Sequence, residues 1–256
     1  MSARGSVAAV DLGATSGRVI VGRVGPDTLE TTAVARFAND PVDTAGGLHW
    51  DFTGLYAHVL DGLREAFTLD GAIRSIGIDS WAVDYGLISG GQLRGEPFHY
   101  RDARTARGVA AVHARLPHAD LYARNGLQFL PFNTLYQFAA EDPADLRDAD
   151  TALLIPDLVA YRLTGIARAE HTNASTTGLL RLDERAWDAS LADTLGIPRR
   201  LLPELIAPGE RLGRLRPEIA ERIGAGRDVA VTAVGSHDTA SAVVAVPMQA
   251  DRAAYI

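Results

Sequence analysis

The sequence predicts an α/β domain in which helices flank a mixed β-sheet, and three observations lead to this prediction. Apolar and β-branched runs separated by short turns fill residues 7–37, a pattern typical of three consecutive antiparallel strands. Apolar residues at helical spacing follow over 53–67, and a buried strand is indicated at 73–81. Further along, the apolar run at 228–234 predicts a strand that leads into a helix beginning at Thr239.

Between these elements the chain is predicted to be mostly helical. Thr53 is a suitable N-cap for the first helix, and residues 85–89 and 93–100 flank two glycines as a hairpin. Residues 171–177 are polar and predict a loop. Further helices are expected over residues 103–116, 134–149 and 152–163, with Gly165 as the C-cap of the last.

Size, composition and charge indicate a folded protein whose main partner is not nucleic acid. The chain has 256 residues, 47% hydrophobic and 22% charged, which is enough for one large domain or two modest ones. Its net charge of -7 argues against nucleic acid or an anionic membrane as the main partner. No apolar run approaches the ~20 residues of a membrane span, and the first residues lack the apolar core of a signal peptide. We therefore expect a soluble, cytoplasmic protein.

Two residue types are absent from the sequence, and their absence excludes several classes of enzyme. There is no cysteine, which rules out thiol nucleophiles, disulfides and thiolate zinc sites. All 25 basic residues are arginines, so the lysine of a P-loop, a protein kinase or a Schiff-base enzyme is missing. If the chain handles ATP, it must use backbone amides, hydroxyl groups, arginine and a metal ion. The arginine usage alone also fits a genome rich in arginine codons.

The first predicted hairpin has the composition of a phosphate-binding turn. A carboxylate, Asp11, precedes a turn of small residues at 13–17, and a second apolar run follows. Glycines allow backbone amides to approach an anion closely, and an aspartate beside them can hold a divalent metal ion. Taken alone, the same stretch also fits an ordinary β-hairpin.

Seven motifs in a fixed order resemble one family of sugar kinases. They are DLGATSGR at 11–18, GIDSWAVDYGLI at 77–88, YRDART at 100–105, NGLQFLPFNTLYQ at 125–137, PDLVAYRLTG at 156–165, TNASTTG at 172–178 and GSHDTASAV at 235–243. In this order, from about residue 7 to the end, they resemble the FGGY carbohydrate kinases, and among these the kinases of L-rhamnulose. The resemblance implies a ribonuclease-H-like (actin-like ATPase) fold. It also implies transfer of the γ-phosphoryl group of ATP, with Mg²⁺, to L-rhamnulose, which gives the 1-phosphate.

The same resemblance implies roles for individual residues. Asp238 would be the catalytic base, and Asp11 would lie on the metal side. The sequence adds that Asp238 follows a strand at the start of a helix, where amides and the helix dipole favour a carboxylate; a plain N-cap is the alternative. The expected phosphate contacts are Ala14, Thr15, Ser16, Gly17 and Arg18, and the expected sugar contacts are Ala82, His237, Asp238 and Thr239.

Several alternatives stay open. The family commonly has glycine where this chain has Ala82, which keeps another FGGY kinase, of xylulose, fuculose or a related sugar, as an alternative. Asp79 and Asp84 could hold sugar hydroxyls with Trp81 stacked on the sugar, or all three could be structural. Two hypotheses come from other functional classes. The chain could be a non-catalytic sugar-binding half, or it could be a carboxylate-pair glycosidase that uses two of Asp11, Asp79 and Asp238.

The resemblance also predicts the domain organisation. Residues 1–251 would form the N-terminal sugar-kinase domain, and residues 252–256 would begin a C-terminal domain that is not in this sequence. That domain would bring most of the adenosine pocket, so this chain would be inactive alone, and we expect an apolar patch on the face it would cover. A natural one-domain protein is the alternative.

Overall fold

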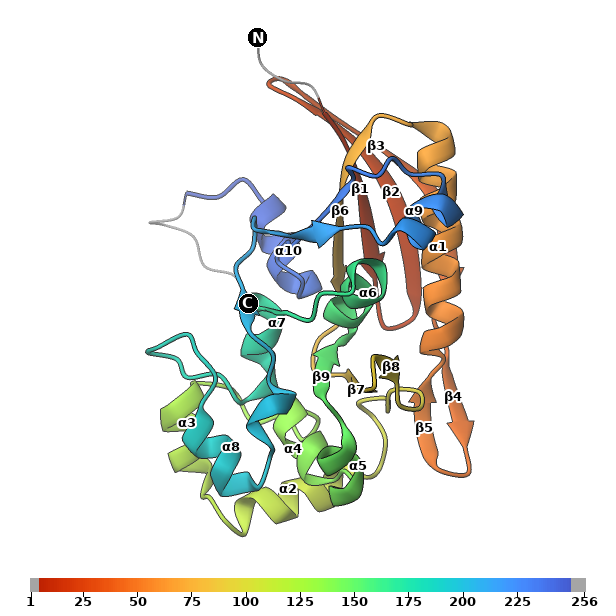
Figure 1. The fold of residues 1–256 in the computed structure, drawn as a ribbon. Coiled ribbons are helices and arrows are strands. Elements are labelled where there is room, and N and C mark those ends of the chain that lie inside the picture. Colours follow the sequence, from red (N-terminus) through yellow and green to blue (C-terminus); the bar gives the residue numbers. More distant parts are fainter. Residues whose placement is uncertain (1–4, 250–256) are drawn as a thin grey trace.

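The computed structural model describes residues 5–249, and its main feature is a twisted six-stranded mixed sheet (Figure 1). The strand order is β12-β13-β6-β1-β2-β3, with β1 parallel to β6, β6 parallel to β13 and the other pairs antiparallel. The strands are β1 (Gly5–Leu12), β2 (Ser16–Gly25), β3 (Thr28–Ala38), β6 (Ile73–Ser80), β12 (Arg211–Arg214) and β13 (Ala230–Thr232). The predicted meander, the strand at 73–81 and the mixed α/β class are confirmed.

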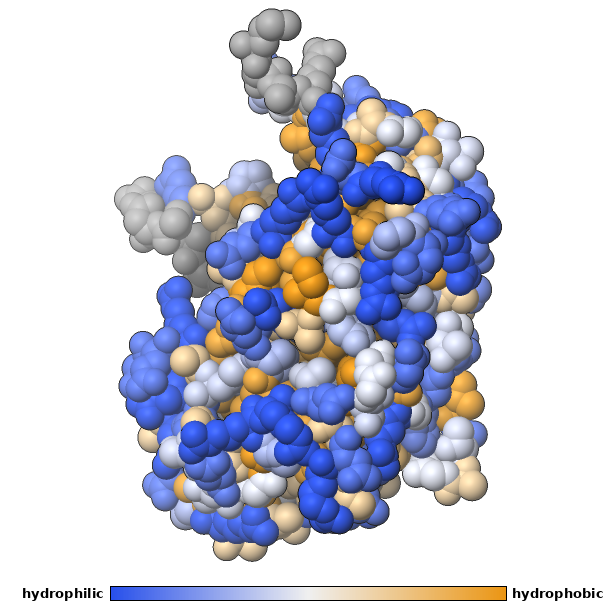
Figure 2. Space-filling model, in the orientation of Figure 1, coloured by the Kyte–Doolittle hydropathy of each residue, from blue (hydrophilic) through white to orange (hydrophobic). Residues whose placement is uncertain are grey.

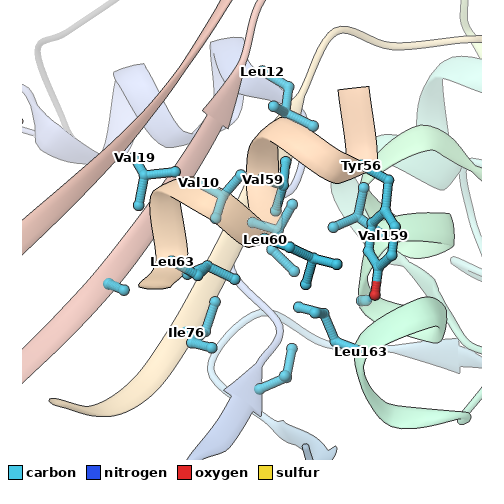
Figure 3. Close-up of a cluster of buried hydrophobic side chains, with 14 of the residues drawn as sticks. Val10, Leu12, Val19, Tyr56, Val59, Leu60, Leu63, Ile76, Val159 and Leu163 are labelled. Carbon is cyan, nitrogen blue, oxygen red and sulfur yellow. The ribbon is translucent and has the colours of Figure 1, made fainter. Parts of the chain in front are cut away.

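One long helix, α1 (Phe52–Leu69), packs against this sheet, as its spacing of apolar residues predicts. Its buried side chains meet those of the strands and of α6 (Ile155–Thr164) in one hydrophobic core. Figure 3 shows part of this core, including Val10, Leu12, Val19, Tyr56, Val59, Leu60, Leu63, Ile76, Val159 and Leu163. The prediction of Thr53 as N-cap is wrong: Asp51 holds that position and accepts a 2.8 Å hydrogen bond from the Gly54 N–H.

A second, mostly helical part lies beyond one end of the main sheet and has its own hydrophobic core (Figure 1). It contains a three-stranded antiparallel sheet in the order β8-β7-β9. Its elements are β7 (Tyr85–Ser89), β8 (Gln92–Leu93), β9 (Thr151–Leu154), α2 (Thr105–His113), α3 (His118–Asn125), α4 (Thr134–Ala139), α5 (Pro143–Asp148) and α8 (Ala189–Leu195). The remaining strands and α-helices are β4 (Pro41–Thr44), β5 (Gly47–Trp50), β10 (Ala169–Glu170), β11 (Leu205–Ile206), α7 (His171–Ala174), α9 (Pro217–Ile223) and α10 (Asp238–Ala245), and 3₁₀ helices cover Ser175–Thr177 and Arg199–Leu201.

Three predictions for the helical region are wrong in detail. The single helix at 134–149 is two helices, because Pro143 cannot continue α4 and instead begins α5, which Asp142 caps. The start of the stretch 152–163 is strand β9, since a short apolar run fits strand and helix equally well. The loop at 171–177 is α7 followed by a 3₁₀ turn. The C-cap at Gly165 is confirmed, with φ of 80°.

Two sequence expectations concern the ends of the chain and the membrane. The predicted second domain at 252–256 lies outside the described residues. Within residues 5–249, no helix is both long and apolar enough to cross a membrane.

Figure 2 shows hydrophilic residues around the rim of one face and apolar residues gathered nearer its centre.

Candidate active site

The carboxyl ends of three parallel strands meet at one edge of the main sheet. β1 and β6 run in register so that Asp11 lies opposite Asp79. The segment after β13 continues alongside β6, because the Ser80 N–H donates to the Ser236 carbonyl at 2.9 Å. This segment leads directly into Asp238, the first residue of α10. Ligands of open α/β sheets bind at such carboxyl ends, so this edge, with its three aspartates, is the candidate active site.

The turn between β1 and β2 is shorter than predicted. The Gly13 N–H donates to the Ser16 carbonyl at 2.8 Å and closes the turn, so that only residues 13–15 form its tip. Ser16 and Gly17 belong to strand β2. Gly17 is needed for packing, because a Cβ there would lie 2.2 Å from the Phe37 ring. Ala14 and Thr15 are therefore the predicted phosphate contacts that lie at the open tip.

The turn is held in place by Asn39, a residue that the sequence analysis missed. Its side chain is 5% exposed and donates to the Gly13 carbonyl at 2.9 Å. Its backbone N–H donates to the Thr15 carbonyl at 3.1 Å. The only signal in the sequence is an asparagine near Pro41, which indicates no more than a turn. Asn39 thus fixes the tip from the far end of β3.

The carboxylates of Asp11 and Asp79 differ in their surroundings. Asp11 forms an ion pair with Arg18, its partner across the β1–β2 ladder, at 2.7 Å. Within residues 5–249, the Asp79 side chain has no hydrogen-bond or ion-pair partner. Burial, and then the negative charges of Asp11 and Asp238, raise the pKa of Asp79 to about 7. Asp79 therefore exchanges its proton near neutral pH.

Asp238 is held in a different way from Asp79. One carboxylate oxygen accepts the Thr239 N–H at 2.7 Å and lies 2.8 Å from Nδ1 of His237, without the alignment of a hydrogen bond. Burial works against ionisation, but the His237 ring and the Thr239 N–H outweigh it, and the pKa of Asp238 is lowered. His237, not Asp238, is the N-cap of α10. The alternative interpretation of Asp238 as a plain N-cap is therefore wrong.

The backbone after Trp81 is strained, but not at Ala82. The Asp84 N–H donates to the Ala82 carbonyl at 2.9 Å, which makes a three-residue γ-turn centred on Val83. Val83 has φ of 69°, a left-handed value that a β-branched residue rarely adopts. The Thr134 hydroxyl holds the turn by donating to the Val83 carbonyl at 2.7 Å. Because φ of Ala82 is not left-handed, its Cβ introduces no such strain.

Asp84 and Trp81 are parts of the core. Asp84 is 0% exposed, and burial raises its pKa to about 6. Its carboxylate accepts hydrogen bonds from the indoles of Trp50 and Trp81, at 2.6 and 3.1 Å, and from the Gln137 amide at 2.8 Å. Trp81 is 6% exposed and packs 4.3 Å from the Trp50 ring. Of the two alternatives left open, the structural one holds for these residues.

The motif at 100–105 also serves the interior. Arg104 forms a buried ion pair with Glu141, and Asp102 accepts the Leu48 N–H at 2.7 Å and the Arg104 N–H at 2.8 Å. Arg101 is exposed and lies 5.3 Å from the centre of the Tyr100 ring. Asp102 and Arg104 are therefore parts of a buried polar network.

Asp11 and Asp79 are the residues that fit a magnesium ion best. Among residues 5–249, no group of three or more His, Asp or Glu is arranged to hold a metal ion by itself. Mg²⁺ is commonly held by one or two carboxylates together with the phosphates of a nucleotide. Two neighbouring carboxylates beside the β1–β2 turn match that requirement.

The strand order places the chain in the class of proteins with the actin-like ATPase fold, and solved structures agree. A gluconate kinase from Lactobacillus acidophilus superposes with a TM-score of 0.80 at 18% identity over 90% of this chain and 47% of its own. A carbohydrate kinase from Novosphingobium aromaticivorans gives 0.80 at 24% identity over 95% and 51%. These identities establish the fold alone.

Sequence comparison gives the family. Residues 7–245 match the model of the FGGY family of carbohydrate kinases, N-terminal domain, and the chain belongs to this family. It is 44% identical to the rhamnulokinase of Pectobacterium atrosepticum and 38% identical to that of Mannheimia succiniciproducens, each over 98% of this chain. The chain spans about half the length (51%) of these curated relatives.

Proposed function

We propose that this chain is the N-terminal domain of an ATP-dependent sugar kinase that phosphorylates L-rhamnulose to its 1-phosphate. The observation that carries the proposal is the sheet edge at which Asp11 and Asp238 lie together, one beside a phosphate-type turn and the other at a helix N-terminus. The similarity to rhamnulokinases supports the choice of sugar. Ala82 is the reason to keep a kinase of xylulose, fuculose or a related sugar as the second candidate.

The proposed reaction is a direct transfer in which Asp238 is the base. The oxygen of the sugar 1-hydroxyl forms a bond to the γ-phosphorus, the bond from phosphorus to the bridging oxygen breaks, and ADP leaves. The hydroxyl proton goes to Asp238. A carboxylate of lowered pKa is a weak base, but it is sufficient because the proton moves late in a loose transition state. His237, Thr239 and the backbone at Ala82 would orient the sugar.

The nucleotide would lie on the other side of the same edge. Ala14, Thr15, Ser16, Gly17 and Arg18 are proposed to contact its phosphates. Mg²⁺, held on the Asp11 side through water, would neutralise phosphate charge. Because ATP is the phosphoryl donor, we expect the enzyme in the cytoplasm.

We further propose that residues 1–251 form one domain and that a second domain, beginning at 252–256, covers α10. This helix has no buried residue, and Val244, Val246 and Met248 are 84%, 53% and 39% exposed. Such apolar exposure at one place indicates an interaction surface. The relatives are about twice as long as this chain, so a domain of similar size is available as the partner. Without it, the chain would lack part of the nucleotide site and be inactive.

The test is a coupled ADP-release assay on the full-length gene product. L-Rhamnulose, L-fuculose and D-xylulose would be compared at equal concentrations, with Asp238→Asn as the inactive variant and Asp183→Asn, on an exposed loop, as its control. We expect the highest kcat/KM with L-rhamnulose and a loss of at least about 10²-fold in Asp238→Asn, the usual size for a general base. Turnover of L-rhamnulose by Asp238→Asn at the normal rate would refute the assigned base. A preference for another sugar would favour the second candidate.

A further inference from the structure

Glu170, at the end of β10, holds the backbone of the segment that leads to Asp238. Its side chain is 2% exposed. One carboxylate oxygen accepts both the backbone N–H and the hydroxyl of Ser236, each at 2.9 Å. Glu170 and Ser236 are 66 positions apart in the sequence, so this contact ties two distant parts of the chain together.

Thr172 extends the contact by one residue toward the base. Its hydroxyl donates to the same oxygen of Glu170 at 2.5 Å and accepts the backbone N–H of His237 at 3.2 Å. Asn173 adds a contact from its side-chain amide to the Ser236 carbonyl at 3.3 Å. The N–H groups of Ser236 and His237, the two residues before Asp238, are therefore both satisfied by Glu170, one directly and one through Thr172.

The hydrogen bonds of this cluster need two acceptor oxygens on the side chain at position 170. The partners of its carboxylate include the N–H groups of Thr172, Asn173 and Ser236, which can only donate. A nearby buried carboxylate, Asp157, accepts the Glu170 N–H at 3.2 Å, and burial together with the charge of Glu170 raises its pKa well above the usual range. A glutamine at 170 would turn an NH₂ group toward N–H donors.

We propose that Glu170 is a positioning residue that fixes the backbone at Ser236 and His237 and thereby aims the Asp238 carboxylate at the sugar hydroxyl. The inference rests on the proposed function, since it needs Asp238 to be the base. The physical reason is that in-line transfer tolerates little displacement of the base: an error of about 1 Å can lower the rate ~10²-fold.

The test is a double-mutant cycle in the full-length chain with Glu170→Gln and Asp238→Asn. Glu170→Gln alone should lower kcat about 10²-fold and change the KM for ATP by less than about 2-fold. In the Asp238→Asn background, the same change should lower kcat by less than about 3-fold, because no base is left to position. Glu204→Gln is the control: it removes a charge from an exposed carboxylate that pairs with Arg168 at 3.0 Å, and it should leave kcat unchanged.

Amide hydrogen exchange provides a readout that does not depend on activity. Exchange of the Ser236 amide should become at least about 10-fold faster in Glu170→Gln and stay unchanged in Glu204→Gln, since an amide without its acceptor opens more often. If Glu170→Gln does not fold, Thr172→Val replaces it in both measurements, because it keeps the side-chain shape and removes one hydroxyl. The amide to follow by hydrogen exchange is then that of His237, which donates to this hydroxyl.

The outcomes separate the inference from the function on which it rests. An unchanged rate in Asp238→Asn would refute the proposed base and, with it, the positioning role of Glu170, whatever the exchange result. Suppose that Asp238→Asn lowers kcat as expected, but Glu170→Gln lowers kcat by the same factor with Asp238 present and with Asp238→Asn. That result would overturn the positioning role and leave the kinase assignment intact. Unchanged Ser236 exchange in Glu170→Gln would also overturn it.

Discussion

Asp11 and Asp79 lie directly opposite each other on the neighbouring parallel strands β1 and β6. Arg18 pairs with Asp11 but not with Asp79, so the second carboxylate has a negative neighbour and no ionic partner of its own among residues 5–249. Such an arrangement is unfavourable for folding whenever both groups are ionised. It fits a site at which a cation and a polyphosphate are bound, and it makes the stability of the free protein depend on pH.

The first prediction concerns this pH dependence. Asp79 has a folded pKa of about 7, raised from 3.8, so the folded state binds the proton more tightly than the unfolded state. Stability should therefore fall as pH rises from about 4 to 7, by an amount on the order of 2–4 kcal/mol. Asp79→Asn should abolish this contribution. Urea unfolding at pH 5 and pH 8, without metal or nucleotide, measures the free energy of unfolding. An equal change with pH in the unmodified protein and in Asp79→Asn would contradict the assignment of this effect to Asp79.

The second prediction concerns the acid side of the rate profile. The His237 ring and the Thr239 N–H lower the pKa of Asp238 against the effect of burial. Since Asp238 must be ionised to act, kcat/KM should fall only below the ordinary pKa range of aspartate. His237→Gln should raise the pKa of Asp238 and move this acid limb to higher pH. The profile of kcat/KM against pH measures this shift as the midpoint of its acid limb, even if the variant has a lower maximal kcat/KM.

A matched control for that experiment is His58→Gln. His58 lies on α1, away from Asp238, and its ring stacks on that of Phe37 with 5.2 Å between the ring centres. The acid limb of the kcat/KM profile of His58→Gln should coincide with that of the unmodified enzyme. An equal shift in both variants would mean that the limb reports some other group.

The third prediction tests why position 17 is glycine. A Cβ at Gly17 would lie 2.2 and 2.6 Å from two atoms of the Phe37 ring. Gly17→Ala should therefore destabilise the fold by about 1–3 kcal/mol, the usual range for overpacking. Phe37→Leu should recover part of this loss in the double variant. Chemical denaturation measures both, with Gly226→Ala, where a Cβ meets no atom within 4 Å, as the control. Equal stability of the two alanine variants would contradict the packing explanation.

The parts of this fold that could be predicted from sequence are those with long regular patterns. The strands β1–β3 and β6 and the helix α1 follow from hydrophobic periodicity, and the αL cap at Gly165 follows from the chemistry of glycine. The motifs also indicate Asp11 near the end of a strand and Asp238 at the start of a helix, where the structure has them. Each of these features depends on residues that are neighbours in the chain.

The features that were missed depend on contacts between distant residues. Asn39 meets the turn at Gly13 only after β3 has folded back along β2. Glu170 meets Ser236 only when β13 has joined the main sheet beside β6. A single polar residue has no periodicity, so nothing in the local sequence distinguishes these two from surface side chains. The left-handed backbone at Val83 was missed as well, because the Thr134 hydroxyl that holds its turn lies 51 positions further along the chain.

The last prediction tests this strain at Val83. A φ of 69° costs a residue with a Cβ about 1–2 kcal/mol, whereas glycine adopts it freely. Val83→Ala and Val83→Gly both remove the buried side chain, so their difference isolates the backbone. Val83→Gly should be at least as stable as Val83→Ala. The control pair is Val21→Ala and Val21→Gly in strand β2, where glycine should be less stable than alanine by about 0.5–1 kcal/mol. The same order of stability in both pairs, measured by urea unfolding, would show that the turn at Val83 is not strained.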